Sequence, residues 1–264
     1  MSLSNINQSN LKEYLDEIVD KVNHLDFIAL DPISIPHRFS VLQDIEISAF
    51  FAAMLAWGNR KTIINKTNEL MNLMDERPYD FIINHSAKDL KPLTSFKHRT
   101  FQTTDLLYFI DFLKRHYQEA DTLEQAFYPR TDPQLYNQEK ALMGFHDYFF
   151  EVEYAPVRTR KHVATPAKKS TCKRLNMYLR WMVRSDDKNV DFGLWKTIPT
   201  SELMIPLDVH VENIGRQLGI ITRKQRDWTT VVELTTFLRT LDPIDPVKYD
   251  YALFGLGVHK GELD

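Results

Sequence analysis

Residues 44–57 constrain the fold most, because apolar side chains lie on almost every side of the helix that this segment predicts. Its charged or hydroxyl-bearing residues are only Asp44, Glu46 and Ser48, and the run stops at Gly58. A helix with so little polar surface normally lies at the centre of a core. We therefore expect the segment to be surrounded by other elements of the same chain.

The rest of the sequence also favours helices over strands. Only 8 of the 264 residues are glycine, and alternating Val/Ile runs are scarce. Residues 31–39 predict an extended connection punctuated by prolines, and residues 155–173 predict loop or short turns. Helical spacing of apolar residues predicts further helices at 11–25, 62–74, 78–84, 104–117, 121–127, 137–150, 173–184, from Asp208 onward, 229–240 and 246–257.

The expected fold class is therefore all-α. We expect residues 1–264 to form a single all-α domain, or two helical lobes that flank a cleft. One lobe would cover about residues 40–150, and the other would combine about 1–40 with 151–264.

Composition excludes several classes of protein. The lone Cys172 excludes an internal disulfide, a four-cysteine zinc site and a four-cysteine iron–sulfur cluster. The polar start of the chain, residues 1–10, contains no apolar signal region, and no run of 18 apolar residues occurs. Phosphate-binding glycine loops and a Gly-x-Ser-x-Gly elbow are absent from the sequence. We expect a cytoplasmic protein that contacts no membrane, and we assume a monomer.

Charge is unevenly distributed along the chain. The formal net charge of −3 argues against indiscriminate coating of nucleic acid, yet residues 158–184 contain nine Lys or Arg and no Asp or Glu. Such a block is either a solvated face or flexible loop, or a surface that binds phosphate. The sequence alone leaves both interpretations open.

Asp208 lies in the segment Ile205-Pro206-Leu207-Asp208-Val209-His210, directly before an apolar helix. The simplest role is an N-cap, in which the carboxylate accepts hydrogen bonds from backbone N–H groups. Its negative charge also interacts favourably with the positive end of the helix dipole. A capping carboxylate is also held in a fixed orientation, which is useful for stabilising a cationic sugar. His210 is two residues away on the helix and faces elsewhere, so the pair makes a poor metal site, and we expect no metal.

Lys173 opens the helix predicted at 173–184. It is either one surface lysine among many or a nucleophile whose amine is kept neutral by nearby cations. Arg174, Arg180 and Arg184 could supply that cationic neighbourhood. Lys168 and Lys169 are the next choices for the nucleophile.

Lys173, followed 35 residues later by Asp208 at a helix start, resembles the helix-hairpin-helix (HhH-GPD) DNA glycosylase superfamily. The resemblance is nearest to the archaeal-type 8-oxoguanine branch and to an uncharacterised bacterial family of this kind. It implies a helical bundle with a central cleft. It also implies a DNA repair glycosylase with AP lyase activity, in which Lys173 attacks the sugar C1′ and Asp208 lies across the cleft. Neither metal nor organic cofactor is implied, and the partner is duplex DNA.

Further DNA contacts are expected from residues of both halves of the chain. The turn after residues 44–57 offers Trp57 to stack on a flipped base and Asn59 or Arg60 to touch a base or phosphate. An ordinary Gly-Asn helix stop with Trp57 in the core explains the same residues equally well. The remaining candidates for contact with DNA are Lys168, Lys169, Arg174, Arg180, Arg184 and His210.

The sequence departs from that superfamily in one respect. In that superfamily the hairpin normally carries glycines whose backbone N–H groups bind phosphate. The corresponding residues here, 163–172, contain no glycine. This departure leaves a non-catalytic helical nucleic-acid-binding protein as the alternative to an enzyme. A helical protein whose basic stretch meets an acidic partner is a third class, which salt-dependent binding of duplex oligonucleotides would separate from the other two.

Overall fold

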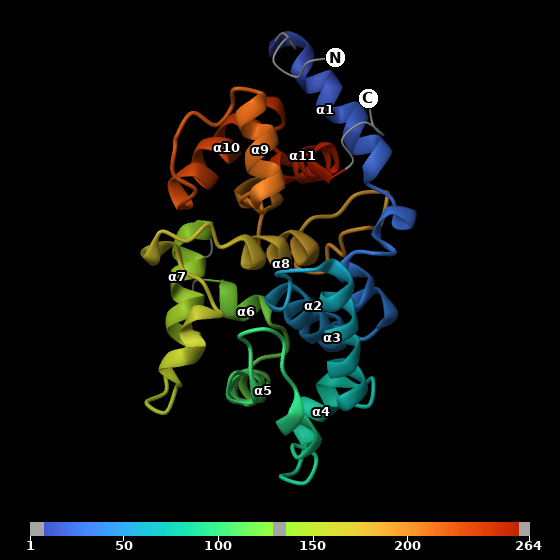
Figure 1. Cartoon of the computed structure of the whole chain (residues 1–264), viewed down its shortest axis with the longest axis vertical. Helices are drawn as coiled ribbons and strands as arrows, with labels where there is room; N and C mark the ends of the chain where they lie inside the picture. The colour runs from blue at the N-terminus through green and yellow to red at the C-terminus, as the bar shows by residue number, and fades with distance from the viewer. Residues whose placement is uncertain (1–7, 129–135, 259–264) are drawn as a thin grey trace. The chain divides into compact units, whose positions relative to one another are not determined.

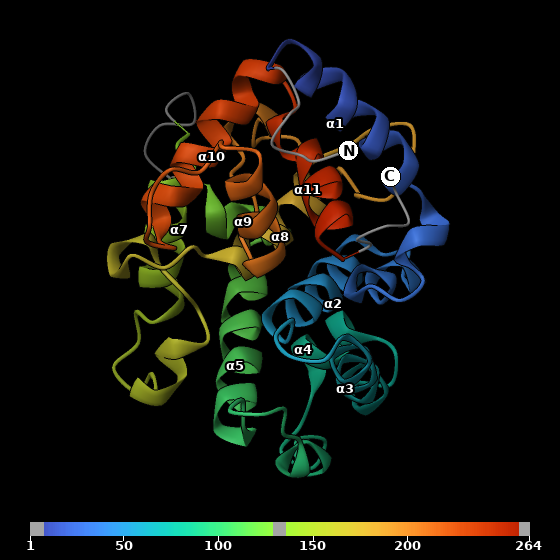
Figure 2. The ribbon, with the colours of Figure 1, turned by 45° about the horizontal axis from the view of Figure 1, so that its top comes forward.

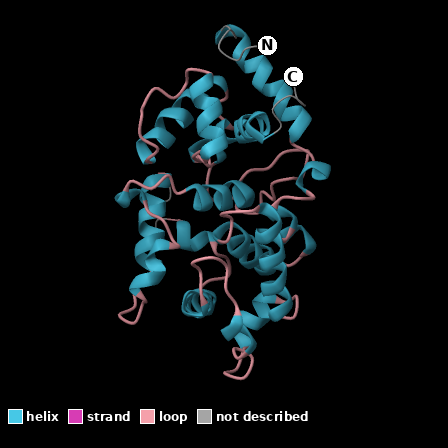
Figure 3. Ribbon diagram, in the orientation of Figure 1, coloured by secondary structure: helices cyan, strands magenta, loops and turns pink. Residues whose placement is uncertain are grey.

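The structure, a computed structural model, describes residues 8–128 and 136–258. Every regular element in these ranges is helical (Figure 3). The β pairing described there is an isolated bridge between His98 and Phe101. The prediction of an all-α chain is therefore confirmed for the described residues. Of residues 1–10, which contain no apolar signal region, residues 1–7 lie outside the described ranges. In the described ranges, no helix combines the length and hydropathy needed to cross a bilayer.

The chain divides into two compact units. Unit 1 combines Met1–Phe27 with Thr165–Asp264, and unit 2 is Ile28–Ala164. Unit 1 contains both predicted catalytic residues, Lys173 and Asp208. Unit 2 contains the turn with Trp57.

Unit 2 is built around α2 (Leu42–Met54), which packs against the neighbouring helices α3 and α4 (Figure 1). Every α2 residue from Ile45 to Met54 is buried, as its all-round apolar pattern predicts. Glu46 is buried too, and its carboxylate accepts hydrogen bonds from Tyr117 Oη at 2.8 Å and Leu123 N at 3.1 Å. The other helices of unit 2 are α3 (Arg60–Leu73), α4 (Pro78–Asn84), α5 (Thr103–Glu119), α6 (Glu124–Phe127) and α7 (Gln138–Phe149).

Aromatic rings fill the core of unit 2 between α2, α5 and α7. Phe50 stacks on Phe109 at a centroid distance of 5.6 Å, and Phe112 lies 4.2 Å from Phe149. Such contacts add to the free energy gained from burying the rings. The predicted helices of this unit are thus present, with ends shifted by a few residues.

Two local predictions in unit 2 were wrong. Residues 31–39 are not extended: they form two 3₁₀ turns, Pro32–Ser34 and Pro36–Arg38. A proline at the first helical position favours such turns, and Asp31 caps the first of them by accepting from Ile33 N at 3.1 Å. The central helix also ends at Met54 rather than at 57, so that Trp57 lies in the turn that follows.

Unit 1 is held together by α11 (Tyr249–Val258), which packs against α1 (Gln8–Val22) and α9 (Val209–Gln217). Both views in Figures 1 and 2 show α11 beside these two helices. The α9 contact is close, because a Cβ on Gly257 would come within 2.8 Å of His210 Cβ. The remaining helices of unit 1 are α8 (Lys173–Val183) and α10 (Trp228–Leu241).

Candidate functional site

The loop before α8 makes tight turns without glycine. Lys169 and Cys172 both adopt left-handed backbone conformations, with φ of 58° and 50°. Glycine is the residue that usually takes such positions. Thr165 caps the short turn Pro166–Lys168, and Ser170 Oγ accepts a hydrogen bond from Cys172 N at 3.2 Å. The hydroxyl groups of Thr165 and Ser170 therefore support a turn geometry that glycines commonly provide.

Lys173 is the first residue of α8. The side chain of the N-cap residue, Cys172, makes no capping hydrogen bond to the first turn, so the N–H groups of that turn keep their positive partial charge. The Lys173 side chain is half-buried, and its Nζ donates to Met177 Sδ at 3.4 Å one turn along the helix. Burial raises the pKa of the Cys172 thiol to about 12, which leaves this neighbour unreactive at neutral pH.

Asp208 is the N-cap of α9, as predicted. Its Oδ1 accepts hydrogen bonds from His210 N at 2.9 Å and from Val211 N at 3.0 Å, which fixes the orientation of the carboxylate. The preceding segment is held by Thr235 of α10, whose Oγ1 accepts from Ile205 N at 3.1 Å. The Asp208 side chain itself is half-buried.

Asn176 links these two helix starts. Its Nδ2 lies 3.1 Å from the carbonyl oxygen of Thr171 and 3.4 Å from that of Ile205. Thr171 is two residues before Lys173, and Ile205 is three residues before Asp208. The loop before α8 and the segment before α9 therefore lie next to each other. Lys173 and Asp208 themselves form no direct ion pair in the described part of the chain.

Asp250 of α11 is the third ionisable group in this region. It is buried, and Arg180 Nη1 donates to its carboxylate. Burial raises the pKa of the Asp250 carboxyl to about 7. The positive charges of Arg180 and Lys173 lower this pKa, whereas the negative charge of Asp208 raises it further. The charges of Lys173 and Asp208 thus both act on Asp250, which places the three groups in one electrostatic neighbourhood.

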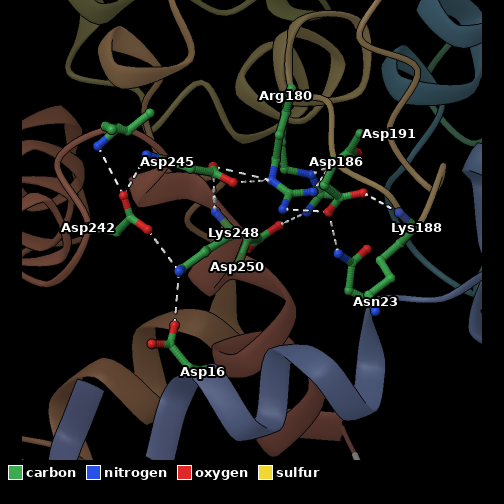
Figure 4. Close-up of polar contacts among 12 residues, drawn as sticks. Asp16, Asn23, Arg180, Asp186, Lys188, Asp191, Asp242, Asp245, Lys248 and Asp250 are labelled. Atoms are coloured by element: carbon green, nitrogen blue, oxygen red, sulfur yellow. Dashed lines mark hydrogen bonds and ion pairs between the residues drawn. The ribbon is translucent and has the colours of Figure 1, made fainter. Parts of the chain in front are cut away.

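Arg180 and Arg184 both pair with carboxylates inside unit 1. Figure 4 shows Arg180 together with its partners Asp191 and Asp250. Arg184 contacts Asp186 at 2.7 Å, Asp245 at 2.9 Å and Asp191 at 3.0 Å, and its side chain is only 3% exposed. Both guanidinium groups also lie over the Tyr251 ring, at 4.4 Å and 5.3 Å. The placement leaves neither arginine with a surface for phosphate, so we do not retain them as DNA-contacting residues. The spacing of Arg180 and Arg184 puts both on one side of α8, but spacing alone could not show that this side is buried.

The other predicted residues of unit 1 differ in exposure. Lys168 and Lys169 are exposed, whereas Arg174 is half-buried and loss of hydration lowers its pKa to about 10. His210 is exposed, and its Nδ1 lies 3.3 Å from the carbonyl oxygen of Gly257. Lys168, Lys169 and His210, which are exposed, remain candidates for contact with a ligand.

In unit 2 the turn after α2 has structural partners. Asn59 is exposed and caps α3 by accepting from Thr62 N at 3.2 Å. Trp57 is half-buried, with its ring 4.8 Å from the His98 ring and 5.8 Å from the His162 ring. Arg60 is half-buried at the start of α3. Asn59 thus caps α3 instead of stopping α2, which ends at Met54, and Trp57 packs against two histidine rings without being fully buried. A role of these residues in binding is neither required nor contradicted.

Sequence reasoning missed Asn176 and Asp250 as members of the site. A usable signal existed for Asp250, because it is the lone charged residue in the otherwise apolar stretch Tyr249–Val258. No comparable signal marks Asn176, since its partners are backbone carbonyls.

One comparison with known proteins identifies a family. The chain matches the family described as "Protein of unknown function (DUF2400)" over residues 31–259, and it therefore belongs to that family. Comparisons with curated proteins and with solved structures give no match.

Proposed function

We propose that this protein is a DNA glycosylase with AP lyase activity that excises an oxidised purine, such as 8-oxoguanine, from duplex DNA. The proposed fold is of the helix-hairpin-helix glycosylase type. Lys173 would be the nucleophile, and Asp208 would stabilise the positive charge that develops on the sugar. No metal or organic cofactor takes part in this proposal.

The observation that carries the proposal is that the segment before α8, whose first residue is Lys173, lies beside the segment before α9, whose N-cap is Asp208. Asn176 links the segments that lead into the two helices, with Nδ2 3.1 Å and 3.4 Å from their carbonyl oxygens. An amine and a carboxylate near one point are the groups needed to substitute at a sugar C1′ carbon. The charges of Asp208 and Lys173 also contribute to the raised pKa of Asp250, in opposite directions.

The chemistry would proceed in three steps. The neutral Lys173 amine would form a bond to C1′ while the C1′–N bond to the base breaks. The base leaves with the electron pair and takes up the proton that the alkylated Lys173 nitrogen then loses. Asp208 faces the developing oxocarbenium-like charge and lowers its free energy. The sugar ring of the adduct would then open to a Schiff base, and loss of a C2′ proton with departure of the 3′ phosphate would cleave the strand.

The loop before α8 would meet the DNA backbone. Lys168 and Lys169 are exposed there, and the uncapped start of α8 directs N–H groups and the positive end of the helix dipole toward an anion. The left-handed backbone of Lys169 and Cys172 supports a hairpin-like turn without glycine. Extrusion of the damaged nucleotide would cost a few kcal/mol, less for a lesion than for an intact pair.

Borohydride trapping tests the enzyme directly. Incubation with an 8-oxoguanine duplex and sodium borohydride should give a covalent protein–DNA adduct, because hydride reduces the Schiff base. Lys173→Gln should abolish the adduct, while Lys168→Gln should weaken binding and still form it. Absence of an adduct across a broad panel of lesions would contradict the proposal.

A non-catalytic nucleic-acid-binding protein is the second candidate. It is favoured by the contact of Lys173 Nζ with Met177 Sδ at 3.4 Å, which directs the amine along its own helix. Salt-dependent binding of duplex DNA without any adduct would support this candidate. No binding of DNA at low salt would instead favour a helical protein that recruits an acidic partner.

A further inference from the structure

The guanidinium group of Arg99, in unit 2, is not engaged by the protein. Arg38, Arg77, Arg115 and Arg158 of the same unit each pair with a carboxylate. Arg99 is exposed, and in the described part of the chain it forms neither a hydrogen bond nor an ion pair through its side chain. A guanidinium carries five N–H donors in a planar fork that matches the oxygens of a phosphate. These donors are therefore available to a ligand.

Gly58 makes room for the Arg99 side chain. A Cβ on Gly58 would come within 2.5 Å of Arg99 Nη1, which is closer than such atoms approach in proteins. Gly58 also has a φ of 102°, a conformation that residues with a side chain rarely adopt. The guanidinium thus lies directly against the backbone of Gly58, and a side chain at this position would displace it.

The backbone of Arg99 is fixed by a tight turn. Its φ is 52°, in the left-handed region that non-glycine residues enter at a cost in free energy. The turn is closed by the bridge between His98 and Phe101, whose two backbone hydrogen bonds both measure 2.9 Å. His98 is buried, with its ring 4.8 Å from the Trp57 ring. The turn therefore holds Arg99 beside Trp57 and Gly58.

The two segments that meet at this contact carry positive charge and no negative charge. Residues 47–68 and 90–104 together contain six Lys or Arg and no Asp or Glu. Of these, Lys61, Lys97 and Arg99 are exposed and form no ion pair in the described ranges. Their combined field attracts an anion to this part of unit 2.

The indole of Trp57 favours a nucleic acid over an acidic protein segment as that anion. Trp57 directly precedes Gly58 and is half-buried, so part of its ring is accessible. The rings of His98 and His162, at 4.8 Å and 5.8 Å, pack against it and hold its orientation. Single strands bind where bases stack on aromatic rings and cationic side chains follow the phosphates. An acidic peptide would use the arginine but has no base to stack on the indole.

We propose that Arg99, seated against Gly58, binds a backbone phosphate of a nucleic acid, and that a base of the same strand stacks on Trp57. The inference rests on the proposed function, because it names a contact through which unit 2 would hold DNA. It requires no chemistry at Lys173, and it involves none of the basic residues of the stretch 158–184.

Fluorescence anisotropy with an undamaged, fluorescein-labelled duplex and with its single strand tests the inference. The decisive variant is Arg99→Asn, because Asn removes the guanidinium yet tolerates a left-handed backbone. Its Kd at about 100 mM NaCl should rise about threefold to tenfold, and the slope of log K against log salt should fall by about one. Trp57→Leu should weaken binding without changing that slope, because stacking releases no counterions.

Arg77→Asn is the matched control. It removes the same charge from the same unit, but Arg77 lies 3.7 Å from the carboxylate of Asp80. Its Kd should stay within about twofold of the wild type. Gly58→Ala tests the seat of the guanidinium: it should weaken binding in the wild type and add nothing in the Arg99→Asn background. If Gly58→Ala does not fold, the comparison of Arg99→Asn with Arg77→Asn decides.

An unchanged Kd and salt slope in Arg99→Asn would overturn the inference, as would an equal loss of affinity in Arg77→Asn. Absence of binding to either oligonucleotide would overturn it too. Competition by polyglutamate as strong as that by unlabelled DNA would indicate an acidic protein partner instead. Binding that depends on Arg99 without a borohydride-trapped adduct counts against the glycosylase alone, whereas an adduct together with unchanged binding by Arg99→Asn counts against this inference alone.

Discussion

Asn176 of α8 lies with its Nδ2 3.4 Å from the carbonyl oxygen of Ile205, so that one buried side chain connects the start of α8 with the segment that leads into α9. The same amide also lies 3.1 Å from the carbonyl oxygen of Thr171. Neither partner is a side chain, and the contact spans 29 residues of sequence. The placement of the two helix starts that carry Lys173 and Asp208 therefore depends on Asn176, a residue with no proposed part in the reaction.

Asn176→Ala should destabilise the fold and separate the two helix starts. Two carbonyl oxygens would lose their partner, at a cost of about 1–3 kcal/mol in the free energy of unfolding. Urea denaturation measures this cost. Asn72→Ala, at an exposed position of α3, is the control and should stay within about 0.5 kcal/mol of the wild type. A fully stable Asn176→Ala protein would show that the amide does not hold these segments together.

Arg184→Met should destabilise unit 1 strongly. The guanidinium of Arg184 contacts Asp186, Asp191 and Asp245, and its removal leaves those carboxylates without their shared cation. Breaking a buried ion cluster of this kind typically costs about 3–5 kcal/mol, measurable by urea denaturation.

The control for that variant is Arg223→Met, which removes a surface pair with Asp227 whose arginine is 34% exposed. It should cost no more than about 1 kcal/mol, because such pairs are hydrated and screened by salt. Equal costs for the two arginines would contradict the view that the Arg184 cluster is held as a buried unit.

Asp250 should make stability depend on pH near neutrality. Burial raises its pKa in the folded protein to about 7 from the ordinary aspartate value of 3.8. The folded state therefore binds a proton that the unfolded state releases between these values, so this group favours folding at low pH and loses that contribution as pH rises through about 7.

Urea denaturation at several pH values measures the effect. The free energy of unfolding should fall by about 1–2 kcal/mol between about pH 5 and pH 8 in the wild type relative to Asp250→Asn. The acids with lowered pKa, among them Asp16 and Asp242, act oppositely, and their contribution is lost only as pH falls below about 4. Parallel pH curves for the two proteins would exclude a buried titration at Asp250.

Lys169→Gly should be better tolerated than Lys168→Gly. Both lysines are exposed and adjacent, but only Lys169 has a positive φ. Glycine at Lys169 relieves a left-handed backbone that costs an ordinary residue about 1–2 kcal/mol, which offsets the added freedom of the unfolded chain. Thermal unfolding should find Lys169→Gly about 1 kcal/mol more stable than Lys168→Gly. The reverse order would show that the loop does not hold the left-handed turn.

Much of the local structure follows from the sequence because its causes are local. The segments 78–84, 137–150 and 173–184 were predicted as helices from apolar spacing, and the structure has α4, α7 and α8 there. Asp208 was predicted as an N-cap from its place before an apolar helix, and it accepts the expected N–H bonds. Capping and periodicity involve only residues within a few positions of each other.

The site could not be predicted in full, because its members are brought together by contacts between distant segments. Arg180 and Arg184 have the spacing of a basic helical stripe, yet that stripe is covered by carboxylates from the following segment and from the end of the chain. The spacing gives the face of a helix but not what packs on it.

The sequence by itself therefore determined an all-helical chain, the starts of α8 and α9, and the presence of an amine and a carboxylate at those starts. Only the tertiary structure decided that Asn176 links the two segments and that Asp250 lies in the field of both groups. It also decided that the arginines of α8 pair internally. The physical reason is that helix formation depends on near neighbours, whereas burial and charge depend on whichever distant residues pack against them.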